Sequence, residues 1–298
     1  MSLRRAPPRP GTGHAGRTPG PAPGASGRSR RRFRYANSLK GTTMIELKTD
    51  AALDAMRVAG RVVAEALAAA RAAAAPGVRV RELDEAARTV LHEAGATSPF
   101  LGYRPSFAPT PFPAVICASV NDAIVHGIPD DTRLRDGDVV GIDCGALVDG
   151  WAGDAAVSFA VGTARPGDQL LLDTTRRALE AGIAAAVTGA RIGDISHAIG
   201  SIGRAAGYGI LDGFGGHGIG RQMHEDPGVP NEGRPGRGFP LRHGLVLAIE
   251  PMFHAGGKDT FVTDPDGWTL RTEDGSRAAH FEHTVAITED GPRILTLP

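Results

Sequence analysis

Residues 139–157 read VVGIDCGALVDGWAGDAAV, a β-rich stretch that carries two aspartates in apolar surroundings. Asp143 interrupts an apolar run, and Asp154 follows eleven residues later. A hairpin turn centred on Val148-Asp149 would place the two carboxylates directly opposite each other, about 5 Å apart at Cβ. Like charges at that distance repel, so such a pair either shares a proton or binds a cation. A solvated loop aspartate beside a capped strand aspartate is common for single residues but explains the facing pair less well.

Two further carboxylates, Glu250 and Glu282, interrupt strand-like apolar runs near the C-terminal end. Each alone would more often be an edge-strand glutamate that faces water. Four carboxylates in four apolar strands are better explained by one shared metal centre. His217 is the expected fifth ligand, in a tight turn, because five glycines in residues 213–220 allow close approach to a bound group. We discount a phosphate loop, since the P-loop ending and the dinucleotide spacing are both missing.

Carboxylates with one imidazole suit a pair of divalent ions, with Co, Mn, Fe and Zn as the candidates. Two such ions, about 3.5–4 Å apart, activate water and polarise a carbonyl, so amide hydrolysis is the expected chemistry. His126 and His224 lie in polar loops, where a lone histidine is more often structural. Beside a metal pair they can instead hold a substrate amide or stabilise an oxyanion. His280 and His283 flank Glu282 without an assigned role, and His254 is treated as structural.

The composition is that of a globular protein. The chain has 298 residues, 41% of them hydrophobic and 22% charged, enough for one large domain or two small ones. No apolar run reaches the length needed to span a bilayer. Two cysteines exclude a disulfide scaffold and a Cys-x-x-Cys zinc site, and they are compatible with a reducing cytoplasm.

Hydrophobic periodicity predicts the order of the elements. A helix capped by Thr49 or Asp50 ends before Pro76-Gly77, and a second helix ends at Gly95. Two more helices are expected at about 168–188 and 195–206, with strands at 114–120, 139–148, 154–161, 245–252 and 281–288. Helices followed by strands, twice over, indicate an α+β fold of two similar halves.

Residues 1–43 differ from the rest in composition. They contain nine Arg and one Lys without any acidic residue, which leaves 23 basic against 33 acidic side chains in residues 44–298. Few apolar residues and many Gly, Pro and Ser predict disorder. We favour the interpretation that residues 1–43 are an idle tail, or that translation starts at Met44 and they are no natural part of the protein. A basic arm for nucleic acid, ribosome or another anionic surface is second, and an address signal is a third alternative.

These motifs, in this order, resemble the type I methionine aminopeptidases, pita-bread metallopeptidases of the M24-like group. The resemblance runs from Met44 to the end of the chain, which supports treating residues 1–43 as additional. It implies a catalytic domain at 44–298 with two pseudo-symmetric halves and a curved antiparallel sheet covered by helices. The matching blocks are Asn121–Pro129, Gly141–Asp154, Gly213–Pro227, Ile249–Met252, Asp266–Trp268 and Glu282–Thr284.

The resemblance also implies residue roles. The metal ligands would be Asp143, Asp154, His217, Glu250 and Glu282. His126 and His224 would position the substrate and stabilise the tetrahedral intermediate, with Glu250 as the proton shuttle. The methionine pocket would be lined by Phe100, Tyr103, Cys117, Met223 and Trp268. Phe100 and Met223 stand where a cysteine and an aromatic residue are usual. The stretch Arg104–Pro113 looks longer than the usual loop, and these departures bear on substrate preference.

The implied function is removal of the initiator methionine from nascent proteins and peptides, with a small second residue preferred. We expect a cytoplasmic monomer without membrane or specific nucleic-acid partners, and the ribosome is a candidate partner. A proline-specific aminopeptidase or prolidase would use the same five ligands but carries a sizeable N-terminal domain, so it ranks second. A non-catalytic pita-bread module has no reason to keep all five ligands and both histidines.

Overall fold

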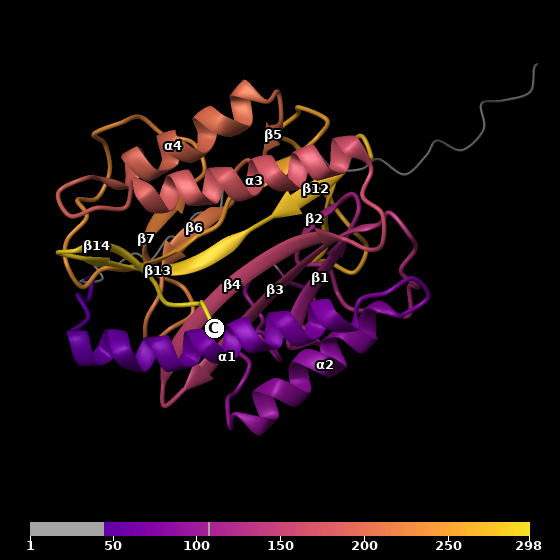
Figure 1. Ribbon diagram of the computed structural model, residues 1–298, viewed down its shortest axis with the longest axis horizontal. Coiled ribbons are helices and arrows are strands. Elements are labelled where there is room, and N and C mark those ends of the chain that lie inside the picture. The colour runs from indigo at the N-terminus through magenta and orange to yellow at the C-terminus, as the bar shows by residue number, and fades with distance from the viewer. Residues whose placement is uncertain (1–44, 107) are drawn as a thin grey trace, which may run out of the picture. The chain divides into compact units, whose positions relative to one another are not determined.

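The computed structural model describes residues 45–106 and 108–298, and the disorder expected for residues 1–43 lies outside this part of the chain. The elements follow one order twice, a pair of helices and then a group of strands (Figure 1). The helix pairs are α1 (Asp50–Ala73) with α2 (Val80–Glu93), and α3 (Pro166–Ala184) with α4 (Ile192–Ala205). This order agrees with the predicted α+β class. None of the helices described is long and apolar enough to cross a membrane.

The strands form one large antiparallel sheet and two small ones. The large sheet has the order β1-β3-β4-β13-β8-β6-β7, with β14 paired to β13. Its strands are β1 (Ile116–Val120), β3 (Val139–Val148), β4 (Trp151–Ala160), β6 (Gly215–Gly218), β7 (Glu225–Pro230), β8 (Val246–Ile249), β13 (Glu282–Thr288) and β14 (Gly291–Ile294). The small sheets have the orders β10-β11-β2 and β12-β9-β5. Their strands are β2 (Ala123–Val125), β5 (Gly209–Ile210), β9 (Met252–His254), β10 (Phe261–Thr263), β11 (Leu270–Thr272) and β12 (Ala278–His280).

Helix α1 illustrates how the sequence sets the elements. Thr49 is its N-cap, and the Thr49 hydroxyl accepts a hydrogen bond from the backbone N–H of Ala52 at 3.3 Å. The apolar face includes Leu53, Met56 and Val63, all at most 1% exposed. Burial of each such side chain contributes roughly 1.5–3 kcal/mol relative to exposure. The cap and the apolar stripe therefore act together, as the spacing predicts.

The two helix pairs cover different parts of the large sheet. In Figure 1, α1 and α2 run below β13, and α3 and α4 run above it. One apolar cluster joins α1 and α2 to β3 and β4, for example through Val63, Leu83 and Ile142. A second cluster joins α3 and α4 to β8 and β13, for example through Ile195 and Leu247. Each half of the fold thus has its own core.

The register of the β3–β4 hairpin differs from the one expected. Val148 pairs with Trp151, so the turn is centred on Asp149-Gly150 rather than on Val148-Asp149. Both turn residues have positive φ, 50° and 73°, which is the conformation of the two-residue turn that Asp-Gly favours. Asp143 and Asp154 are therefore not directly opposite each other, and that expectation was wrong. They are offset by two residues and still share one face, because side chains alternate with period two.

The boundaries of other elements also differ from those expected. The strand expected at 245–252 is divided into β8 and β9, since Pro251 has no N–H for a ladder hydrogen bond. Glu250 therefore lies between two strands rather than inside one. His217 lies within strand β6 rather than in a tight turn. Helix α3 begins at Pro166, a residue suited to the first helical turn, and α4 begins at Ile192.

Candidate active site

The five predicted metal ligands come from adjacent strands of the large sheet. Asp143 is on β3, Asp154 on β4 and Glu282 begins β13, while Glu250 directly follows β8 and His217 is on β6. Strands β3, β4, β13, β8 and β6 are consecutive neighbours in the sheet order. The antiparallel pairing thus brings together positions that span residues 143–282.

The first row of side chains crosses β3, β4 and β13. Asp143 pairs with Ala156, and Ala156 pairs with Glu282. Paired positions point to the same face of a sheet. The small Ala156 therefore leaves the space between the two carboxylates open.

The second row is two residues further along the strands. The Thr284 hydroxyl donates to the Asp154 carbonyl at 2.8 Å and accepts from the Asp154 N–H at 3.0 Å. Thr284 pairs with Ala248, which pairs with His217. Asp154 and His217 are thus held on the same face, separated by two small side chains.

His217 owes its position to the glycines around it. A Cβ atom at Gly216 would lie 2.1 Å from the carbonyl oxygen of Ala248, so only glycine permits the close pairing of β6 with β8. His217 Nδ1 lies 2.8 Å from the carbonyl oxygen of Gly218. A neutral ring that donates from Nδ1 presents its Nε2 lone pair to the site, as metal-binding histidines do.

The donor atoms lie close together. His217 Nε2 is 3.8 Å from Asp154 Oδ2 and 3.8 Å from Glu250 Oε1. Among the described residues, two groups have donor atoms within 4.8 Å of one another, and Glu282 belongs to both. One contains Asp154 and His217, and the other contains Glu250 and His280. The two donor groups overlap at Glu282, so the site offers two adjoining candidate ligand sets for metal ions.

Burial of so many carboxylates shifts their pKa values. Burial raises the pKa of Asp143 to about 7, with His280 opposing and Glu250 adding to the shift. Burial and the neighbouring carboxylates raise the pKa values of Asp154 and Glu282 well above the usual range. Burial acts in the same direction on Glu250, but nearby imidazoles, His280 first, outweigh it and lower the Glu250 pKa. Without a cation the cluster cannot ionise fully at neutral pH.

The same cluster fits a metal centre by its unsatisfied atoms. Within the described part of the chain, the buried oxygens Asp143 Oδ1, Asp154 Oδ1 and Glu282 Oε1 have no hydrogen-bond partner. Buried carboxylate oxygens are normally paired with a donor or a cation. Oxygen donors with imidazole suit divalent transition metals. The donor chemistry and the orphaned oxygens therefore both fit bound divalent ions.

His126 and His224 both lie beside this cluster. His126 directly follows β2 with a φ of 60°, and burial lowers its pKa to about 4. Burial and the nearby His217, whose ring centroid is 4.5 Å away, lower the pKa of His224 to about 3. Both imidazoles are neutral at pH 7, so each can donate a hydrogen bond without adding a positive charge beside the cations.

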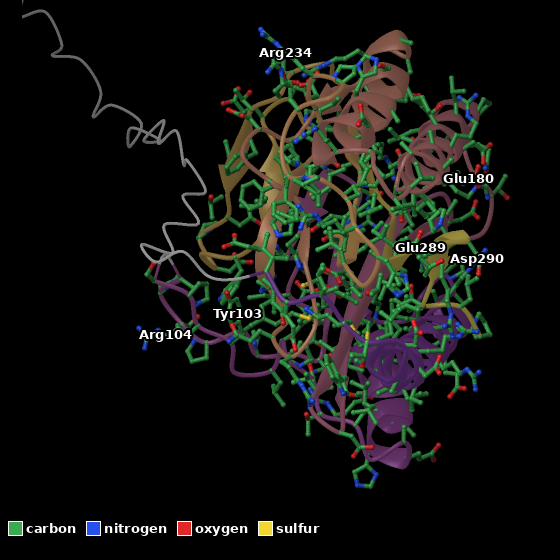
Figure 2. All side chains as sticks on the ribbon, turned by 90° about the vertical axis from the view of Figure 1, so that its left-hand side faces the viewer. Tyr103, Arg104, Glu180, Arg234, Glu289 and Asp290 are labelled. Atoms are coloured by element: carbon green, nitrogen blue, oxygen red, sulfur yellow. The ribbon has the colours of Figure 1, made fainter. Side chains whose placement is uncertain are left out.

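The carboxylates line a cavity whose remaining wall is largely apolar. It has a volume of about 80 Å³, and its walls combine the metal-binding candidates and both histidines with aromatic and thiol groups. Of the predicted pocket residues, Phe100, Tyr103, Cys117 and Trp268 line it. Phe112, which sequence reasoning missed, also lines it, 5.1 Å from Trp268 between ring centroids. Figure 2 places Tyr103 and Arg104 at the margin opposite Glu180 of α3, so this side of the site lies away from that helix.

Met223 borders the cavity less directly than the other predicted pocket residues. It does not line the cavity, and its methyl group packs beside Gly145, next to Phe100. The 104–113 stretch, described except for residue 107, lines the cavity through Phe112, and its Thr110 carbonyl accepts a hydrogen bond from the indole N–H of Trp268 at 3.0 Å. The predicted role of Met223 in substrate binding stays a prediction.

His280 is the residue that sequence reasoning left without a role. Its Nε2 lies 3.4 Å from Glu250 Oε2 and 3.8 Å from Glu282 Oε2. One signal was present in the sequence, since a residue two positions before Glu282 shares its face in extended backbone. His283 points the other way and its Nδ1 lies 2.8 Å from the Thr296 hydroxyl.

Comparison with known proteins agrees with this geometry. The model of metallopeptidase family M24 matches residues 54–289. Methionine aminopeptidase 1 of Mycobacterium tuberculosis is 55% identical over 266 residues, covering 87% of this chain and 97% of the relative. Methionine aminopeptidase of Clostridium acetobutylicum is 46% identical, covering 85% and 99%.

Solved structures agree as well. The crystal structure of methionine aminopeptidase from Thermotoga maritima has a TM-score of 0.81 and 39% identity, covering 86% of this chain and all of that one. Prolidase from Pyrococcus horikoshii has a TM-score of 0.65 at 22% identity, with 64% of its length covered, which shows a shared fold alone. These matches agree with a pita-bread fold built on a curled antiparallel sheet. The chain belongs to metallopeptidase family M24 and, within it, to the type I methionine aminopeptidases.

Proposed function

We propose that this protein removes the initiator methionine from nascent polypeptides and peptides by metal-dependent hydrolysis. One observation carries the proposal: the buried donor cluster and a set of apolar side chains line the same cavity. The cluster supplies the hydrolytic chemistry, and the cavity selects the first side chain. We assign the metal-binding role to Asp143, Asp154, His217, Glu250 and Glu282, with two divalent ions from among Co, Mn, Fe and Zn.

The residues of the chain perform the remaining tasks. Two bound divalent ions would supply an activated water and a polarised scissile carbonyl. Glu250, whose pKa is lowered, is ionised at neutral pH and can take the proton of the attacking water. Glu250 then returns this proton to the departing amine, so the peptide bond is replaced by a carboxylate and a new N-terminus. His126 and His224 donate to the substrate amide and to the oxygen that becomes negative.

Specificity follows from the cavity walls. Cys117, Phe112 and Trp268 belong to one buried apolar cluster, and Phe100 packs against it. Burial and the adjacent carboxylates raise the pKa of the Cys117 thiol, which keeps that wall uncharged. A thioether side chain packs well against sulfur and aromatic groups. We therefore propose methionine as the first residue and a small second residue, because bulk there would collide with the site walls.

The catalytic domain is proposed to comprise residues 44–298, which contain the whole family match at 54–289. The proposed substrates are the N-termini of nascent chains. The ribosome as a docking partner, the monomeric state and the role of residues 1–43 stay predictions.

Peptide cleavage tests the function. Metal-stripped protein is incubated with Met-Ala-Ser or Ala-Pro-Ser, with and without added Mn or Co, and the released amino acid is measured. We expect methionine release from the first peptide only, and only with metal. Cleavage of Ala-Pro-Ser would assign the protein to the proline-specific branch. No cleavage of either peptide by metal-loaded protein would overturn the proposal in favour of a binding module.

A further inference from the structure

His280 is held firmly at the inner end of the donor cluster. It ends strand β12, and its backbone is fixed to β4 through Ser158. The Ser158 hydroxyl donates to the His280 carbonyl at 2.8 Å and accepts from the His280 N–H at 2.9 Å. The imidazole is therefore positioned by two backbone hydrogen bonds between neighbouring elements.

The Nε2 atom of His280 is buried and unsatisfied. The side chain is 5% exposed, and Nε2 has no hydrogen-bond partner among the described residues. Its distances of 3.4 Å to Glu250 Oε2 and 3.8 Å to Glu282 Oε2 exceed the usual N–H···O range of about 2.7–3.2 Å. A buried ring nitrogen without a hydrogen-bond partner, aimed at two carboxylates beyond hydrogen-bond distance, points to a missing binding group.

The spacing suits ligands of a common ion. Nitrogen and oxygen ligands lie about 2.0–2.2 Å from a transition metal, so two ligand atoms of one ion are roughly 3–4 Å apart. Both His280 distances fall in this range. His217 Nε2 lies within the same range of the other Glu250 oxygen, 3.8 Å from Oε1. Glu250 is thus flanked by one imidazole at each oxygen.

We propose that His280 is a sixth protein ligand of the metal centre, binding through Nε2 to the ion that Glu250 and Glu282 also hold. This inference rests on the proposed metal-dependent function. It gives the centre two imidazoles instead of one. Because imidazole suits Co and Zn better than Mn, His280 would bias the centre toward the softer ions.

The test counts imidazoles and compares metals. Wild type, His280→Gln and the control His283→Gln are loaded with Co(II), and X-ray absorption measures the imidazole scattering per two bound ions. Glutamine keeps the size and polarity of the side chain, and His283 lies three residues away, where its ring contacts the Thr296 hydroxyl instead of the donor cluster. Near-UV circular dichroism verifies that each variant is folded.

We expect two imidazoles in wild type and in His283→Gln, and one in His280→Gln. The dissociation constant for Co should rise at least tenfold in His280→Gln, with a smaller rise for Mn. One imidazole in wild type itself, which is measured without any substitution, would overturn the inference. Equal losses of Co and Mn affinity with an unchanged imidazole count would also overturn it. Wild type that binds no Co would instead refute the metal-dependent function.

Discussion

Replacement of Asp143 by Asn should stabilise the metal-stripped protein. Burial raises the pKa of this carboxyl from its usual 3.8 to about 7. Each pKa unit corresponds to about 1.4 kcal/mol, so the ionised carboxylate costs the folded, metal-stripped protein up to about 4 kcal/mol at pH 8. Asparagine has nearly the same shape and cannot ionise. The variant should therefore be more stable than wild type by an amount approaching this limit.

The pH dependence has a definite sign. The folded pKa lies above the unfolded one, so the folded protein holds the additional proton between pH 3.8 and about 7. The stability that this proton provides is present at low pH and is lost as the pH rises through 7. The cost that Asn removes is therefore smaller at pH 5, about 2 kcal/mol. Buried histidines such as His126, whose pKa is lowered, titrate in both proteins, so their contributions cancel in the difference in stability between variant and wild type.

Urea unfolding with a chelator, at pH 5 and at pH 8, measures the difference in stability between variant and wild type and its dependence on pH. We expect the variant to gain more stability at pH 8 than at pH 5. With added Mn, wild type should instead be more stable than the variant, because only wild type keeps the full set of carboxylate ligands. A variant that is less stable than wild type at pH 8 without metal would refute the reasoning, as would a gain that does not change with pH.

Three further predictions follow from the same structure. The Lys48 side chain is 2% exposed and forms an ion pair with Glu225, the neighbour of His224, at 2.6 Å. Lys48→Met should lower the free energy of unfolding, measured in urea, by about 3 kcal/mol, because it leaves the Glu225 carboxylate without its cation. A decrease under 1 kcal/mol would contradict a buried ion pair. Gly216→Ala should lower stability by about 1–3 kcal/mol and weaken metal binding, because the added Cβ would collide with the Ala248 carbonyl. The control Gly228→Ala, which has open space around it, should change neither. Equal effects of the two substitutions would contradict this steric explanation. The apparent affinity for Mn, measured by titration calorimetry, should fall at least tenfold for each pH unit below 7. Protons compete with the ion for carboxylates whose pKa is raised, such as Asp143. An affinity that does not depend on pH would exclude this competition.

Much of the site was predictable because buried charge is costly. Asp143, Asp154, Glu250 and Glu282 stand in apolar runs, and the metal-centre hypothesis followed from that conflict alone. In the structure all four line one cavity together with His217. Helix starts were equally accessible, since Thr49 and the apolar stripe after it are local signals.

The pairing register was not predicted correctly. Asp143 and Asp154 point to the same face of the sheet in either register, because side chains alternate with period two and the register differs from the expected one by two residues. Their exact partners depend on which two residues take positive φ in the turn. Asp149-Gly150 is a strong signal for that conformation, and giving it more weight would have corrected the register.

His280 and Phe112 were missed for another reason. Phe112 has no local signal in the sequence, and the spacing of His280 two residues before Glu282 does not by itself show that the two side chains meet. Their importance comes from long-range pairing, β12 beside β9 and the 108–114 segment over Trp268. A single sequence contains no direct record of such contacts.

We propose that the five converging side chains hold the metal on which methionine release depends. The most direct measurement is release of methionine from Met-Ala-Ser by wild type, His217→Ala and Asp154→Ala during titration with Mn or Co. Circular dichroism checks that both variants are folded. We predict turnover that rises with bound metal in wild type and is absent in both folded variants. Wild-type rates in either variant, or wild-type turnover with no metal bound, would contradict the account.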